Sequence, residues 1–205
     1  MKDYFASLHM LDCVGSSVTK FLIEAGKLST MTHCQQVAKQ ARELAAYLGL
    51  DDDKPAARAA WCHDLAAVVP VSEMLPLAES WNLPLTDSDR AIPMLLHGVI
   101  GAEAARRQLD INDEDALNAI RYHSTLRAGA STLEKAVFVA DKIAVDPTSP
   151  RKDFVPLLKD ALAAGQSIDE LALIYLNWTV ENGPDLGWVL HENVLAAQAY
   201  LRNGR

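Results

Sequence analysis

Two histidines and two aspartates in this sequence have the side-chain chemistry of a metal site. They are His33, the adjacent pair His63 and Asp64, and Asp141. Each lies among apolar residues that recur every three or four positions, which predicts that each side chain points from a helix toward the protein core. An ionised carboxylate on such a face requires a cation or a hydrogen-bond network nearby. One divalent metal would satisfy all four residues together.

The donor types limit which metal would bind. Imidazole and carboxylate donors without thiolate suit Fe(II), Mn(II), Co(II), Ni(II) or Zn(II) better than Mg(II) or Ca(II), which prefer oxygen donors. The neighbours His63 and Asp64 are expected near the end of an alanine-rich helix, where they would be about 100° apart around its axis. Both could therefore reach one ion lying between them. The choice among the five transition metals stays open on these residues.

His97 and His123 form a second group of candidates on two further predicted helices. They could bind a second metal with Asp64 as the bridging ligand, or they could stay off the metal and donate hydrogen bonds to a phosphate. We favour a single, tightly bound metal. One histidine on an apolar helix face is usually an ordinary core residue. The metal prediction therefore depends on four histidines and two aspartates falling on the inward faces of five successive helices.

The elements that must position these residues are helices, and strand alternation is essentially absent. Apolar periodicity and capping signals, including capping boxes at Ser131 and Ser167, place the helix boundaries. A stretch with four prolines, 70–93, should hold short helical pieces and loops, and 146–156 should be a loop. The predicted helices are about 33–48, 55–69, 97–109, 113–123, 132–144, 168–182 and 190–201.

The composition predicts one globular domain over residues 1–205, with 1–20 as an N-terminal helical extension and about 167–205 as C-terminal helices packed on the core. The net charge of −8, with scattered Lys and Arg, argues against a nucleic-acid polymer as partner but leaves small phosphorylated ligands. Three cysteines without a CxxC spacing, no secretory signal and no long apolar run favour a cytoplasmic protein without a membrane span. Apolar faces on the C-terminal helices would be compatible with a homodimer.

Several other side chains with chemical potential are assigned to packing. Cys34 and Cys62 adjoin candidate ligands but are expected to be small core residues. His9 and His191, near the termini, are expected to be surface or packing residues. The tryptophans are expected to anchor the core, although one of them could stack on a nucleobase; they are Trp61, Trp81, Trp178 and Trp188.

The order H, then HD, then a later D resembles the HD superfamily of metal-dependent phosphohydrolases. The resemblance extends to its YqeK branch over nearly all of the chain from about residue 20. The similar segments include TMTHCQQVAKQARELAAYLGL, AAWCHDLA, LLHGVIGA and LNAIRYHSTLRAGASTLEKAVFVADKI. The resemblance implies an all-α, single HD-domain helical bundle, an iron centre, and symmetrical hydrolysis of diadenosine tetraphosphate to two ADP. It further implies that the metal ligands are His33, His63, Asp64 and Asp141, and that His97, His123 and Ser124 face the phosphates.

This chain departs from the branch at two places. Where the branch is expected to have the sequence HTTG, this chain has a leucine, Leu126, in place of the glycine. Where the branch tends to have an arginine six residues after the late aspartate, this chain has Pro147. Arg127 or Arg151 could supply the missing guanidinium, and we take Arg127 as the candidate substrate contact.

The expected mechanism is hydrolysis of a phosphoanhydride by a metal-activated water. Asp64 would orient or deprotonate the water, while His97 and His123 would stabilise the developing charge and protonate the leaving phosphate. Two alternatives remain on the sequence. One is a phosphohydrolase of nucleoside 5′-monophosphates, and the other is a nucleotide-binding sensor that keeps the metal without catalysis.

Overall fold

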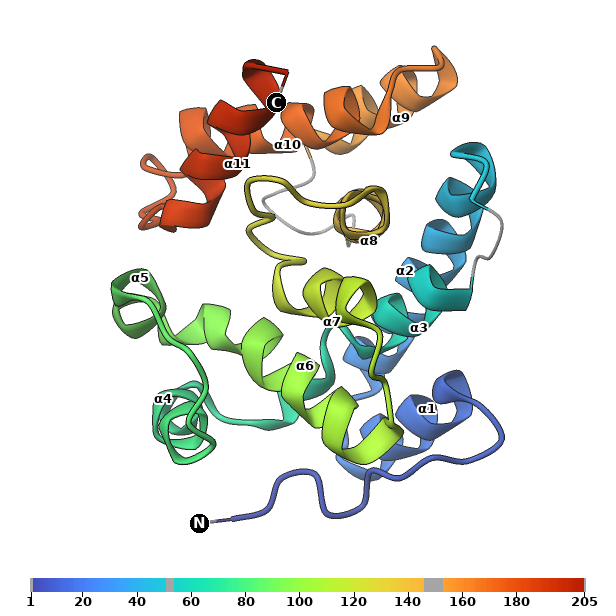
Figure 1. The fold of residues 1–205 in the computed structure, drawn as a ribbon, viewed down its shortest axis with the longest axis vertical. Coiled ribbons are helices and arrows are strands. Elements are labelled where there is room, and N and C mark those ends of the chain that lie inside the picture. Colours follow the sequence, from blue (N-terminus) through green and yellow to red (C-terminus); the bar gives the residue numbers. More distant parts are fainter. Residues whose placement is uncertain (1, 51–53, 146–152, 205) are drawn as a thin grey trace.

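The computed structural model describes residues 2–50, 54–145 and 153–204, and the regular structure within these ranges is entirely helical (Figure 1). The predicted all-α fold is thus confirmed. The helices are, in chain order, α1 Val14–Glu24, α2 Leu28–Tyr47, α3 Lys54–Cys62, the 3₁₀ helix η1 Leu65–Val68, α4 Val71–Ser80, α5 Asp87–Ala91, the 3₁₀ helix η2 Pro93–Leu95, α6 Leu96–Leu109, α7 Glu114–Arg121, α8 Thr132–Ile143, α9 Val155–Ala163, α10 Ile168–Asn182 and α11 Glu192–Arg202.

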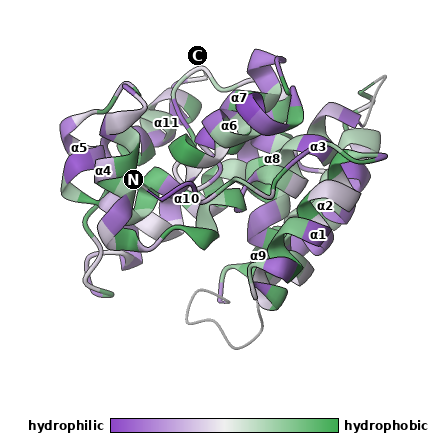
Figure 2. Ribbon diagram, turned by 90° about the horizontal axis from the view of Figure 1, so that it is seen from below, coloured by the Kyte–Doolittle hydropathy of each residue, from purple (hydrophilic) through white to green (hydrophobic). Residues whose placement is uncertain are grey.

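Four helices form the centre of the molecule. α3 and α8 pack on each other and on both α2 and α7, and α8 lies in the middle, where Figure 2 shows it largely hydrophobic. Small residues allow this close packing, since Ala56 and Ala60 of α3 and Ala41 of α2 are fully buried. The central helices and the turns that directly follow α3 and α7 hold most of the candidate ligands, so the core of the fold also holds the candidate site.

The remaining helices surround this centre. α6 packs on α7, η1 and α4. α10 packs on both α8 and α11. Both predicted capping boxes are present: the Ser131 and Ser167 hydroxyls each accept from the amide three residues later, and the glutamates there accept in return. Within the described ranges, none of the helices combines the length and the apolar character that a membrane crossing requires.

The structure differs from the sequence prediction near the N-terminus. The first helix starts only at Val14, so the expected helical extension over 1–20 is wrong for most of its length. The residues before it are held by burial instead, because Phe5 and Leu8 are each 1% exposed and belong to the core.

Two further boundaries differ. α3 ends at Cys62, earlier than predicted, and η1 follows after a two-residue turn. α9 begins at Val155, inside the expected loop, with Pro156 in its first turn, where proline costs no hydrogen bond. The rest of that expected loop, 146–152, lies outside the described residues.

Candidate metal centre

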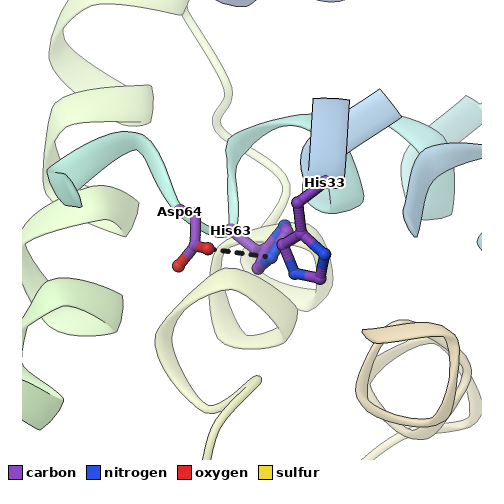
Figure 3. A group of neighbouring side chains, drawn as sticks. All are labelled: His33, His63 and Asp64. Carbon is purple, nitrogen blue, oxygen red and sulfur yellow. Dashed lines mark ion pairs between the residues drawn. The ribbon is translucent and has the colours of Figure 1, made fainter. Parts of the chain in front are cut away.

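The four predicted ligands meet at one place in the fold. His33 comes from α2 and Asp141 from α8, and both point at the turn after α3 that carries His63 and Asp64. Figure 3 shows the rings of His33 and His63 beside the Asp64 carboxylate. His33 Nε2 lies 2.9 Å from Asp141 Oδ1, and His63 Nε2 lies 3.5 Å from Asp64 Oδ2 and 3.8 Å from Asp141 Oδ1. Donors that share an ion at about 2.1 Å are roughly 3–4 Å apart, so this spacing fits a metal.

The His63 imidazole provides the test of whether a metal belongs here. Its Nδ1 lies 2.6 Å from the Ala60 carbonyl oxygen, which can only accept, so Nδ1 carries the proton and Nε2 keeps a lone pair. Nε2 is completely buried and has no hydrogen-bond partner among the described residues. A buried acceptor without a partner costs about 1–3 kcal/mol. The residues therefore fit a divalent cation bound at Nε2.

His97 and His123 form a second cluster around the same aspartate. Asp64 Oδ1 lies 3.5 Å from His97 Nε2 and 3.7 Å from His123 Nε2. Their Nδ1 atoms also contact backbone carbonyls three residues earlier, so the two Nε2 lone pairs face each other at 3.0 Å. The Ser124 hydroxyl, 3.1 Å from His123 Nε2, can satisfy one of them. A second cation would relieve the remaining repulsion.

The charges of the site suit metal binding at neutral pH. Burial alone would raise the pKa of Asp64, but the imidazoles of His63, His97 and His123 outweigh it and lower that pKa to about 2. Burial likewise opposes ionisation of Asp141, yet Lys142 and His33 hold its pKa well below the usual range. Burial, followed by the neighbouring imidazoles, lowers the pKa of His123. Ionised carboxylates and a neutral imidazole are the forms that bind metals.

The approach of α6 to the end of α7 brings His97 into this cluster, and Gly98 permits it. A Cβ at Gly98 would lie 2.5 Å from the backbone oxygen of Arg121 and 3.2 Å from that of Ile120. Both atoms belong to backbone, which cannot move aside as a flexible side chain can. The glycine therefore sets how closely the two histidines approach.

The turn that carries His63 and Asp64 corrects the predicted geometry of this pair. The two residues follow the end of α3, and Asp64 has φ −107° and ψ 20° at the start of η1. The expected separation of 100° around a helix does not apply to them. The direction of each side chain depends instead on the turn and, for His63, on the bond to the Ala60 carbonyl.

A main cavity of about 470 Å³ adjoins the cluster. His33, Asp64, His97, His123, Ser124 and Asp141 line one side of it, and the segment from Gly187 to His191 lines the other. Trp188 belongs to that segment, so one tryptophan does lie where a base could stack. The centroids of the Trp188 and Trp178 rings are 5.9 Å apart.

Two residues of the cavity wall have roles that the sequence analysis missed. Lys142 is buried, and its ammonium donates to Asp141 Oδ2 at 2.5 Å and to the His123 carbonyl oxygen at 3.1 Å. His191 is buried, as expected of a packing residue, but it also caps α11 and lies 3.2 Å from the Asp89 carboxylate. Only the adjacency of Lys142 to Asp141 could have been noticed in the sequence.

Arg127 is not brought to the cavity. Its guanidinium donates two hydrogen bonds to the buried Glu134 carboxylate, from Nη2 at 2.6 Å and from Nε at 2.8 Å. Arg127 does not line the main cavity. Its expected role as a substrate contact has no support from this placement, because Glu134 occupies two of its donors. Pro147 and Arg151 lie outside the described residues.

The missing glycine at Leu126 has a visible consequence. Leu126 adopts φ +57°, in the left-handed region that favours glycine, and its side chain is buried. The chain thus keeps the turn that a glycine would make and bears a strain of about 1 kcal/mol for it.

Cys34 and Cys62 are buried core residues as expected, and burial raises the pKa of both thiols, which keeps them protonated.

The comparisons with known proteins agree with this geometry. Residues 30–146 match the HD domain family. The chain is 38% identical over 128 residues to a symmetrical bis(5′-nucleosyl)-tetraphosphatase of Bacillus subtilis, covering 62% of this chain and 68% of that one. It is 40% identical over 111 residues to the enzyme of the same name from Halalkalibacterium halodurans, covering 54% and 58%.

A solved structure is similar along almost the whole chain. It is the crystal structure of a predicted HD superfamily hydrolase involved in NAD metabolism from Clostridium acetobutylicum, with a TM-score of 0.81 and 30% identity over 93% of this chain and 97% of that one. The range that matches the HD domain family, 30–146, contains the clustered histidines and aspartates described above. This chain therefore belongs to the HD domain family, as a hydrolase similar to the symmetrical bis(5′-nucleosyl)-tetraphosphatases.

Proposed function

We propose that this protein hydrolyses diadenosine tetraphosphate symmetrically, one water being consumed and two ADP released, with iron as its resident metal. The observation that carries the proposal is the buried lone pair of His63 Nε2, which faces two ionised carboxylates at the edge of a nucleotide-sized cavity. The names of the relatives supply the substrate class, a bis(5′-nucleosyl) tetraphosphate, and the resemblance to the YqeK branch supplies the adenosines. Iron is compatible with the imidazole and carboxylate donors.

The proposed metal ligands are His33, His63, Asp64 and Asp141. A divalent ion at this place would lower the pKa of a water molecule and neutralise charge on the attacked phosphoryl oxygens. Asp64 reaches both histidine clusters, so we assign it to accept a hydrogen bond from the attacking water and orient it.

His97, His123 and Ser124 are the proposed phosphate contacts. The Nε2 atoms of both imidazoles and the Ser124 hydroxyl lie within 3.4 Å of one another and line the main cavity. A phosphate placed there would accept from the hydroxyl, and a protonated imidazole would donate to the leaving phosphate oxygen. The second cluster could also hold a second ion, with Asp64 as the bridge.

The test is product analysis after incubation with diadenosine tetraphosphate. Protein loaded with Fe(II) or Mn(II) is compared with metal-stripped protein, and products are separated by ion-exchange chromatography. We expect ADP as the only nucleotide product, formed in a metal-dependent way. Elemental analysis of protein purified without oxygen then tests whether iron is the resident metal.

Other product patterns would refute the proposal in identifiable ways. ATP and AMP in equal amounts would show asymmetrical cleavage. Inorganic phosphate released from AMP, without cleavage of the dinucleotide, would support a nucleoside monophosphate phosphohydrolase. Tight nucleotide binding without any product at any metal loading would support a sensor.

A further inference from the structure

A second cavity, of about 280 Å³, lies directly against the main cavity. The two share four lining residues, which form the partition between them: Leu95, Ser124, Thr125 and His191. The partition includes the Ser124 hydroxyl, which is 3.1 Å from His123 Nε2. A group held at the histidine cluster therefore has the second cavity as its next neighbour on one side.

The side chains of the second cavity are suited to a phosphorylated ligand. Arg121 lines it, together with Tyr122, Thr86 and Asn193. The Asp89 carboxylate also lines it, and it accepts hydrogen bonds from the Thr86 amide and from His191. The Arg121 guanidinium donates to Asn118 on its own helix and lies 5.9 Å from the Tyr122 ring centroid. Within the described ranges it forms no ion pair with a carboxylate, so its charge is available to a phosphate.

We propose that this second cavity is the half-site for the other nucleotide of a two-ended substrate. The inference rests on the proposed function: cleavage in the middle of a symmetrical dinucleotide puts the reacting phosphates at the metal and sends one nucleotide to each side. The main cavity offers the candidate metal ligands and Trp188 to one end. The second cavity offers Tyr122 and Arg121 to the other.

Charge supports this division of the substrate. The chain has a net charge of −8, so a tetraphosphate needs local cations to bind at all. Arg121 contributes one in the second cavity, whereas Lys142 in the main cavity is already paired with Asp141. Arg121 thereby supplies a guanidinium near the site, which Arg127 cannot do while it is paired with Glu134.

The test compares a two-ended with a one-ended substrate in the full-length, metal-loaded protein. The two-ended substrate is diadenosine tetraphosphate, and the one-ended substrate is the p-nitrophenyl ester of ADP, which has no phosphate or nucleoside on its leaving side. Arg121→Gln is measured beside Arg106→Gln, a matched control. Arg106 also bonds a side chain three residues earlier on its helix and lines neither cavity.

We expect the ratio of kcat/KM for the dinucleotide to that for the ester to fall by about tenfold or more in Arg121→Gln, as loss of a charged hydrogen bond predicts, and to stay unchanged in Arg106→Gln. An unchanged ratio in Arg121→Gln would overturn the half-site, and so would an equal loss on both substrates. Failure of the wild-type protein to make ADP would instead overturn the proposed function, and the half-site with it.

Discussion

Replacing Gly98 with alanine is expected to separate His97 from His123 and so disable the site without touching any ligand. The added Cβ would lie 2.5 Å from the Arg121 backbone oxygen, whereas ordinary van der Waals contact begins at 3.4 Å. α6 must therefore move away from the end of α7 by about 0.9 Å. His97 is the residue before Gly98, so it moves with the helix.

The size of the effect follows from that displacement. A misplacement of about 1 Å can cost roughly 100-fold in rate. Overpacking lowers the free energy of unfolding by about 1–3 kcal/mol. The better helix propensity of alanine offsets at most about 1 kcal/mol of that loss. We expect kcat for diadenosine tetraphosphate to fall by about 100-fold, with a loss of about 1 kcal/mol in the free energy of unfolding.

Gly101, one turn later on α6, supplies the matched control. A Cβ at Gly101 would have its nearest neighbours at 3.6 Å, which is ordinary contact. Gly101→Ala should therefore keep full activity and gain up to about 1 kcal/mol from helix propensity. Steady-state kinetics with Mn(II) and urea unfolding of metal-free protein measure both quantities. If Gly98→Ala matched Gly101→Ala in rate and stability, the assigned role of Gly98 would be wrong.

Two further predictions concern carboxylates. Asp64→Asn removes the negative charge that both histidine clusters share, so metal content and turnover should each fall by at least roughly 100-fold. The circular dichroism spectrum should stay that of the wild type. Substantial remaining activity would refute the central role of Asp64. Burial opposes ionisation of Asp89, but its hydrogen bonds with His191 and Thr86 lower its pKa below the ordinary value of 3.8. The carboxylate therefore stabilises the protein above that value and loses its contribution as the pH falls through the lowered pKa. Wild type should exceed Asp89→Asn in unfolding free energy by up to about 2 kcal/mol at pH 7, and the difference should vanish in acid titrations; a difference that grew toward low pH would contradict the assignment.

The sequence predicted the all-α fold, most of the longer helices and a set of candidate ligands that the structure brings together. Periodicity and capping predicted α8 and α10 closely, because these helices bury an apolar face and begin with recognisable caps, whereas α2 begins at Leu28 without a side-chain cap, five residues before the predicted start. The apolar faces of α2 and α8 carried His33 and Asp141 to the core, where the structure finds them 2.9 Å apart. A charged residue that interrupts an apolar stripe was thus an informative local signal.

What the sequence could not reveal depends on contacts between distant segments. Arg127 pairs with Glu134 rather than with the cavity, and His191 meets Asp89 across about a hundred residues of chain. The role of Gly98 is equally invisible locally, because only the position of the α7 carbonyls makes it necessary. The early end of α3 escaped prediction since alanine-rich sequence continues past Cys62 with no breaker before Pro70.

The three histidines whose Nδ1 atoms contact carbonyls three residues earlier have a consequence for how the site is assembled. These bonds, from His63, His97 and His123, close within a single turn of chain and involve no other segment. Contacts of that range form on the microsecond timescale of helix formation. Each ring can adopt its metal-binding tautomer before the distant helices dock. Later folding has only to bring together donors that already present the correct nitrogen, which leaves the connecting loops free to vary in length.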